Sequence, residues 1–178
     1  MNLKSDFEKE IKLQLQKELG FTNPMAVPTL EKVSVAMGVG SKREDKEYIK
    51  TAQDDIAAIS GQKPSLRTAK RSIAGFNVRK GQLVGLQATL RGIRMWDFFE
   101  KFVKVSLPRT KDFRGISRRS MDGNGNISVG MPEHTIFAEI DPNKVDKIKP
   151  LGVVITTTAK NDEQGYALLK ALGFPFRD

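Results

Sequence analysis

Two segments of the chain alternate apolar and polar residues, the pattern of a β-strand that buries one face. Residues 31–40 and 83–91 share this pattern, and their apolar positions are Val33, Val35, Met37, Val39, Val84, Leu86, Ala88 and Leu90. Two further segments, HTIFAEI (134–140) and VVITTTA (153–159), are rich in β-branched residues and are also predicted to be strands. A chain with such strands must cover one face of a sheet and leaves the other face available to a partner.

Amphipathic helices are predicted between these strands. Apolar residues recur at helical spacing in residues 5–19, 42–61, 93–107 and 161–172, and Gly20, Gly61 and Pro108 mark three of the ends. Residues 122–125, DGNG, have the chemistry of a hairpin turn. Helices separated by hairpin-like strands predict a two-layer α+β fold, an antiparallel sheet with helices packed mainly on one face. We expect residues 1–178 to form a single domain.

Positive charge is concentrated in the centre of the chain. Residues 56–96 contain no acid and eight cations: Lys63, Arg67, Lys70, Arg71, Arg79, Lys80, Arg91 and Arg94. Residues 56–121 hold fifteen lysines and arginines against three acids, whereas the rest of the chain holds fifteen against eighteen. Segregated positive charge favours a polyanionic partner, because phosphates release condensed counterions when cations approach. A solvated basic face without a partner is the alternative.

Several function classes find little support in the sequence. The chain has no cysteine, which excludes disulfides and thiolate metal sites and suits a reducing compartment. Its charged N-terminus does not resemble a signal peptide, and no apolar run approaches the roughly 20 residues of a membrane span. We therefore expect a cytoplasmic protein with no membrane contact.

The sequence also contains few residues or motifs that could support catalysis. His134 is the only histidine, and a lone histidine in such a stretch is usually a partly buried polar residue. Residues 37–42, MGVGSK, lack the spacing of a phosphate-binding loop. Residues 122–133 resemble a calcium loop, but Ile127 stands where the sharp turn needs glycine. We predict no enzyme, no cofactor and no metal site. A metal-dependent nuclease using Asp122 and Glu133 is the enzymatic alternative.

Two clusters have more than one interpretation. The aromatic residues Trp96, Phe98, Phe99 and Phe102 could stack on bases, but their helical spacing favours the core. Arg114, Arg118 and Arg119 lie in a loop-like segment, where they are either solvated or bind phosphate or an acidic protein.

Ten blocks of the chain, in order, resemble the bacterial members of the 5S rRNA-binding ribosomal protein family, protein five of the large subunit. They are MAVPTLEKVSVAMGVG, AAISGQKP, AKRSIAGFNVRKG, ATLRGIRMWDFFEKF, PRTKDFRGIS, GNGNISVG, IFAEI, VDKI, ITTTAK and LLKALGFPF. The resemblance extends from about residue 6 to residue 177. No single block is specific, but ten in register are.

The resemblance implies an α+β protein that attaches 5S rRNA to the central protuberance, beside 23S rRNA and neighbouring 5S rRNA-binding ribosomal proteins. The implied 5S rRNA surface comprises Val35, Met37, Gly38, Gly40, Gln62, Lys63, Pro64, Thr89 and Arg91. The implied contacts to the peptidyl-site tRNA are Lys70, Arg71, Ala74, Gly75, Phe76, Arg79 and Lys80. An intersubunit bridge to a small-subunit head protein would use Arg109, Lys111, Arg114, Arg118 and Arg119, within residues 109–152.

Three positions depart from the family pattern. Ala36 replaces a common asparagine, Ile127 a common tyrosine, and Ala138 a common proline. The loss of the asparagine amide removes one possible RNA contact. A free-standing RNA chaperone that uses the same basic block is the alternative to a ribosomal protein. The two differ in selectivity, because only the ribosomal protein should prefer 5S rRNA.

Overall fold

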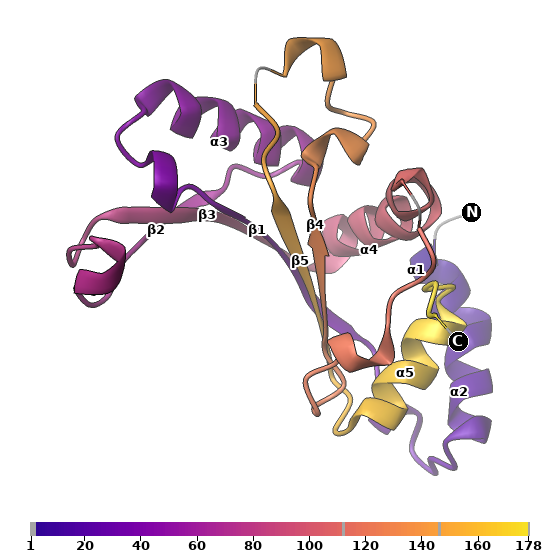
Figure 1. Ribbon diagram of the computed structural model, residues 1–178. Coiled ribbons are helices and arrows are strands. Elements are labelled where there is room, and N and C mark those ends of the chain that lie inside the picture. Colours follow the sequence, from indigo (N-terminus) through magenta and orange to yellow (C-terminus); the bar gives the residue numbers. More distant parts are fainter. Residues whose placement is uncertain (1–2, 112, 146, 178) are drawn as a thin grey trace. The chain divides into compact units, whose positions relative to one another are not determined.

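The computed structural model describes residues 3–111, 113–145 and 147–177 (Figure 1). The strands are β1 (Leu30–Gly38), β2 (Ser65–Thr68), β3 (Leu83–Leu90), β4 (Ile127–Met131) and β5 (Leu151–Thr157). The α-helices are α1 (Leu3–Asp6), α2 (Lys12–Glu18), α3 (Lys46–Ser60), α4 (Gly92–Lys101) and α5 (Asp162–Ala171). Two π-helical segments, η1 (Phe7–Ile11) and η5 (Phe102–Ser106), join α1 to α2 and extend α4. Single 3-10 turns are η2 (Pro24–Ala26), η3 (Gly40–Lys42), η4 (Ala74–Phe76), η6 (Leu107–Arg109), η7 (Arg118–Ser120), η8 (His134–Ile136) and η9 (Pro142–Lys144).

The five strands form an antiparallel sheet in the order β2-β3-β1-β5-β4. In the β2–β3 pair Ser65 lies opposite Gln87, and the register shifts between Arg67 and Thr68. The predicted α+β class and antiparallel sheet are confirmed. The four predicted helices are also confirmed, two of them with a π-helical segment in the middle or at the end.

The chain divides into two compact units. One consists of residues 1–33, 91–129 and 154–178, and the other of residues 34–90 and 130–153. The chain passes from one unit to the other within β1, β4 and β5. Whether these units together form the single domain expected from the sequence stays a prediction.

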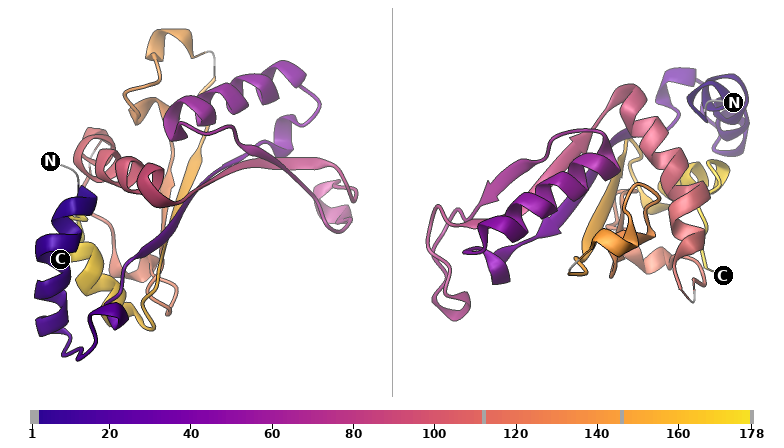
Figure 2. Two further views of the ribbon diagram at one scale, coloured as in Figure 1. Left: turned by 180° about the vertical axis from the view of Figure 1, so that it is seen from behind. Right: turned by 90° about the horizontal axis from the view of Figure 1, so that it is seen from above.

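In the second unit, helix α3 packs against strand β3. It begins at Asp45, whose carboxylate accepts a hydrogen bond of 3.0 Å from the Tyr48 backbone N–H, and it ends at the left-handed Gly61. Its apolar face buries Ile56 and Ile59 completely. Figure 2 shows the helix lying along one side of β3. All four residues of β2 are exposed, and so is the hairpin that continues past the paired strands β2 and β3.

The first unit has an aromatic core. The rings of Phe98 and Phe102 stack with 5.9 Å between their centroids, and Phe7 lies 5.2 Å from Trp96. Trp96 is only 5% exposed and Phe99 is fully buried. These rings fill the space between α1, α4 and the C-terminal segment, so they are core residues, as their helical spacing indicated.

The predicted strand at residues 134–140 is wrong. This segment forms η8 followed by turns. Its buried residues are His134, Phe137 and Ile140, which are three positions apart. That spacing fits successive 3-10 turns, whereas a strand buries every second residue.

Candidate RNA-binding surface

The acid-free segment builds an exposed hairpin beyond β2 and β3, here called the basic hairpin (residues 69–82). At its base the Ala69 N–H donates to the Gln82 carbonyl at 2.8 Å. Nearer the tip, Ile73 and Val78 exchange backbone hydrogen bonds of 2.8 and 3.2 Å. The turn η4 closes the tip, and Asn77 after it is left-handed with φ of 50°. The exposed hairpin tip expected from the sequence is thus present.

Every residue assigned to the tRNA contact by resemblance lies on this hairpin and is exposed. They are Lys70, Arg71, Ala74, Gly75, Phe76, Arg79 and Lys80. The Phe76 ring at the tip is 75% exposed. Because the hairpin contains no acid, its cations have no carboxylate partner within it. The arrangement presents four positive charges and one aromatic ring to whatever binds there.

The residues assigned to 5S rRNA differ in exposure. Val35 and Met37 on β1 are 0% and 2% exposed, so their side chains belong to the core and only their backbone can face a partner. Gly38 is exposed and Gly40 partly exposed. A Cβ atom on Gly85 of β3 would lie 3.1 Å from the Met37 carbonyl, which shows how closely β1 and β3 approach here.

Gln62 and Thr89 are brought together, although 27 residues separate them. The Gln62 side-chain amide donates to the Thr89 carbonyl at 3.3 Å. Ser60, which the sequence analysis missed, is buried beside this loop. Its hydroxyl lies 2.6 Å from the Ile56 carbonyl and 2.9 Å from the Gln62 carbonyl, and either can accept its single proton. Its only sequence signal is its place before Gly61. The other assigned residues differ in exposure: Lys63 and Arg91 are exposed, and Pro64 is buried.

The residues assigned to the bridge are all exposed in the first unit: Arg109, Lys111, Arg114, Arg118 and Arg119. The Arg118 guanidinium lies 4.0 Å from the centre of the Tyr166 ring. The preceding segment is held to the C-terminus, because the Ile116 N–H donates to the Pro175 carbonyl at 2.9 Å. These contacts give an ordered basic surface, although residues 112 and 146 of the assigned range lie outside the described residues.

The departures from the family pattern fall in different environments. Ile127 is fully buried, Ala36 is partly buried and Ala138 is exposed. The Ile127 side chain therefore contributes to the core. That Ala36 removes an RNA contact stays a prediction.

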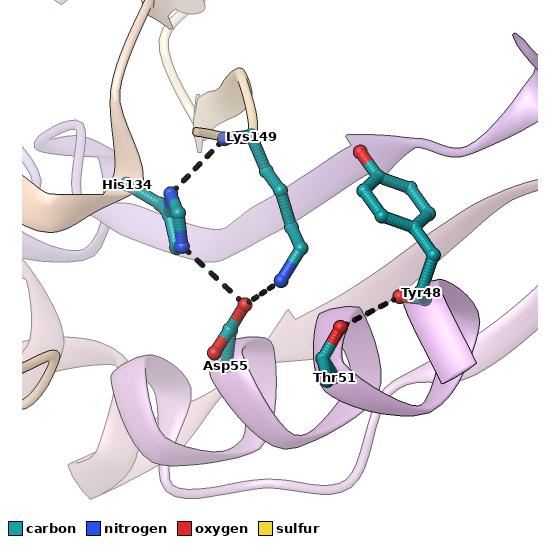
Figure 3. Close-up of polar contacts among 5 residues, drawn as sticks. All are labelled: Tyr48, Thr51, Asp55, His134 and Lys149. Carbon is teal, nitrogen blue, oxygen red and sulfur yellow. Dashed lines mark hydrogen bonds and ion pairs between the residues drawn. The ribbon is translucent and has the colours of Figure 1, made fainter. Parts of the chain in front are cut away.

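His134 belongs to a buried polar cluster and is not a catalytic centre (Figure 3). Its Nδ1 accepts a 3.2 Å hydrogen bond from the Lys149 backbone N–H, so the neutral imidazole carries its proton on Nε2. Nε2 lies 3.4 Å from Oδ2 of Asp55, and the Lys149 ammonium lies 2.5 Å from the same oxygen. His134 is 0% exposed, so no substrate can reach it.

Electrostatics in this cluster favour the ionised carboxylate. Burial by itself would raise the pKa of Asp55, but the polar contacts from His134 and Lys149 outweigh burial and lower its pKa. Burial, and then the Asp55 charge, raises the pKa of the nearby Tyr48. Asp55 thus holds the segment that carries His134 and Lys149 against α3.

The residues that resembled a calcium loop form a hydrogen-bonded turn. The Asp122 carboxylate accepts from the Asn124 and Asn126 N–H groups at 2.9 and 3.1 Å. The Asp162 carboxylate accepts from the Gly123 and Gly125 N–H groups at 3.1 and 2.8 Å. The Asp122 carboxylate thus stabilises the turn itself, and Asp162 attaches the turn to α5. Among the described residues, no group of three metal-ligating side chains lies together.

The helices are too short or too polar for a bilayer. Within the described part of the chain, none has the length and apolar character needed to span a membrane.

Comparison with known proteins identifies the family. The family model of ribosomal protein L5 matches residues 23–79, and the model of the C-terminus of the same ribosomal family matches residues 83–176. The large ribosomal subunit protein uL5 of Francisella tularensis subsp. tularensis (strain SCHU S4 / Schu 4) is 50% identical over 175 residues, which cover 98% of each chain. The uL5 protein of subsp. novicida (strain U112) is equally similar, with the same coverage.

The exposed cations and these matches define a structural protein of the large ribosomal subunit. The chain belongs to the uL5 family. Members of this family are structural components and not enzymes, in agreement with the sequence analysis. As a ribosomal protein, the chain is ribosome-bound in the cytoplasm and associates with rRNA.

Proposed function

We propose that this protein binds 5S rRNA and helps to attach it in the central protuberance, beside 23S rRNA and the neighbouring 5S rRNA-binding proteins. In this proposal the basic hairpin contacts the peptidyl-site tRNA. The exposed cations between residues 109 and 119 form an intersubunit bridge to a small-subunit head protein. The nuclease alternative is set aside, since the family is structural and Asp122 is engaged in a turn.

One observation carries the proposal: all eight cations of the acid-free segment are exposed, and four of them lie on the basic hairpin, which projects beyond its paired strands. A carboxylate at this position would face phosphate, and residues 56–96 have none. A basic tip can approach an RNA backbone with little sequence discrimination. This is the chemistry expected of a contact that must accept every tRNA.

The second unit also has polar groups suited to reading RNA shape. The Gln62–Thr89 contact orders a polar loop beside the exposed Lys63. Amides and hydroxyls of this kind bind sugar hydroxyls and base edges of folded RNA. Val35 and Met37 would take part through their backbone groups, because their side chains are buried.

A gel-shift titration tests the proposal. The purified protein is titrated against 5S rRNA, a tRNA and an unrelated structured RNA of similar length, each at several salt concentrations. Binding should weaken as salt rises, with a log–log slope of roughly −0.7 to −0.9 per phosphate contacted. We expect the 5S rRNA complex to persist at salt concentrations that dissociate the unrelated RNA.

If all three RNAs dissociate together, the protein alone is an unselective RNA-binding surface. Adding the neighbouring 5S rRNA-binding proteins then decides between the two alternatives. Restored selectivity would support assembly-dependent recognition of 5S rRNA, and continued lack of selectivity would favour the RNA chaperone.

A further inference from the structure

Arg43 connects the end of β1 to the tip of the basic hairpin. It follows η3, and its Nη1 donates to the Gly40 carbonyl at 3.3 Å. Its Nη2 donates to the Asn77 carbonyl at 2.8 Å, across 34 residues of sequence. One guanidinium therefore spans two carbonyls in segments that belong to the same compact unit. The planar fork of arginine suits such a bridge, whereas a lysine ammonium is a single point of charge.

Few contacts restrain the tip of the basic hairpin from within, so the contact with Arg43 matters for its position. Residues 70–77 are all exposed, and their backbone pairing with the other side of the hairpin is at Ile73. No packed side chains therefore fix the direction of the tip. Asn77 is the only non-glycine residue with positive φ among the described residues. Among residues with a Cβ, asparagine is one of those that tolerate left-handed backbone, so this conformation is available to Asn77 without strain. The charge-assisted hydrogen bond from Arg43 to the Asn77 carbonyl restrains the tip from outside the hairpin.

We infer that Arg43 is a positioning residue for the basic hairpin and prepares it for RNA. This inference rests on the proposed contact of the hairpin with tRNA. The Arg43 guanidinium can act on binding through its charge and through the position of the hairpin, and the inference concerns the second effect. A hairpin that is already ordered loses less conformational freedom on binding, so the complex is tighter.

Three single variants separate position from charge. Arg43→Ala removes both the charge and the bridge, and Arg43→Lys keeps the charge but loses the fork. Lys42→Ala is the matched control, since it removes one positive charge from the adjacent residue. Lys42 is exposed, and its ammonium lies 4.8 Å from the centre of the Tyr48 ring on α3.

The first measurement is amide hydrogen exchange by NMR on the free protein. In Arg43→Ala, the Asn77 and Val78 amides should exchange about three- to tenfold faster than in the wild type, the effect of losing one partly exposed hydrogen bond to a charged group. The amides of Leu86 and Leu90 in β3 should be unchanged. Lys42→Ala should leave all four rates unchanged, and Arg43→Lys should fall between the two.

The second measurement is a titration of each variant with a purified tRNA and with 5S rRNA. Arg43→Ala should weaken tRNA binding about threefold or more beyond the effect of Lys42→Ala. If the role of Arg43 is confined to the hairpin, Arg43→Ala and Lys42→Ala bind 5S rRNA equally; a loss in Arg43→Ala alone would place its effect at Gly40, on the assigned 5S rRNA surface, and overturn that confinement. Because both remove the same charge, the difference in tRNA affinity reports the position of the hairpin.

The outcomes separate the inference from the proposed function. Unchanged exchange at Asn77 and Val78 in Arg43→Ala overturns the inference. If the Asn77 and Val78 amides exchange faster in Arg43→Ala but this variant binds tRNA as tightly as Lys42→Ala does, Arg43 orders the hairpin without any effect on binding. That result overturns the positioning role in binding. If the amides exchange faster in Arg43→Ala but the wild-type protein does not bind tRNA, the Arg43 contact with the hairpin is supported. The proposed contact of the hairpin with tRNA is then overturned.

Discussion

At the scale of single residues, Asp55 is the centre of the buried polar cluster in the second unit. One of its carboxylate oxygens faces both the Lys149 ammonium and His134 Nε2. The Lys149 side chain is only 6% exposed, so it cannot recover its hydration if the carboxylate is removed.

We predict that Asp55→Asn lowers the free energy of unfolding by about 2–3 kcal/mol, because it leaves a buried ammonium without a counter-charge. Urea denaturation followed by circular dichroism measures the effect. Asp54→Asn is the matched control, since this neighbouring carboxylate on α3 is exposed and should change stability by less than about 0.5 kcal/mol. Equal stability of the two variants would mean that the Lys149 ammonium reaches water.

The same carboxylate predicts a pH dependence. The folded state lowers the pKa of Asp55 from its ordinary value of 3.8, so the unfolded chain binds a proton more readily. The stabilisation is therefore present above that value and is lost as pH falls through the lower folded-state pKa. The difference in unfolding free energy between wild type and Asp55→Asn should be largest near neutral pH and should shrink below about pH 4. A difference that grows on acidification would contradict this assignment.

Residue chemistry was predictable only in part. The lack of a catalytic role for His134 could be predicted, because a lone histidine in such a stretch is usually a partly buried polar residue. Its partner Asp55 lies 79 positions away, and Lys149 is one of three lysines in the polar segment 141–150, where nothing distinguishes it from the others. Their pairing depends on tertiary contacts that no local pattern reveals.

At the scale of elements, two glycines hold the turn of residues 122–126 against α5. A Cβ on Gly165 would lie 2.5 Å from the Gly125 carbonyl oxygen, and one on Gly125 would lie 2.6 Å from the Ala159 Cβ. The helix thus touches the turn backbone directly, while Asp162 accepts from two N–H groups of the turn.

Gly165→Ala should therefore destabilise the protein, although alanine is the better helix former by about 1 kcal/mol. The clash is with backbone, which cannot rotate away, and we expect a net loss of about 2 kcal/mol in a thermal or urea melt. Gly130→Ala in β4 is the control, because its Cβ would meet nothing within 4 Å and its φ is not positive. A Gly165→Ala protein as stable as wild type would show that α5 can shift away from the turn.

Helices and strands with a clear apolar periodicity could be predicted from the sequence. The wrongly predicted strand at residues 134–140 shows where such prediction fails. Four helices and the alternating strands follow from their spacing. Residues 134–140 contain β-branched and aromatic residues, which favour strands, but their buried positions repeat every third residue. At the start of this segment His134 accepts a hydrogen bond from the Lys149 backbone, a contact that is not local and that no sequence pattern indicates.

At the scale of the whole molecule, the segregation of charge links sequence to function. The net charge of +9 arises from the central block, and the structure displays part of that block on the basic hairpin. The charge map could be predicted in full from the sequence. The exposure of the hairpin was expected, whereas the Arg43 bridge that restrains it was not.

Reversing three hairpin cations tests this link. The triple variant with Lys70, Arg71 and Lys80 changed to Glu should lose most of its tRNA affinity, with a log–log salt slope smaller by roughly 0.7–0.9 for each phosphate that the variant no longer contacts. The control reverses Lys9, Lys17 and Lys160, which are exposed and outside the hairpin. Both variants have a net charge of +3, six below the wild-type value of +9, so general electrostatics are matched.

The fold should survive in both variants. The three hairpin side chains are exposed, and the hydrogen bond of 3.0 Å at Lys80 uses its backbone N–H, which any residue but proline supplies. Circular dichroism and thermal melts should therefore match the wild type within the effect of surface substitutions, about 0.5 kcal/mol each. If the control loses as much tRNA affinity as the hairpin variant, net charge alone governs binding and the hairpin has no special role. If only the hairpin variant loses affinity while remaining folded, position and charge act together at this surface.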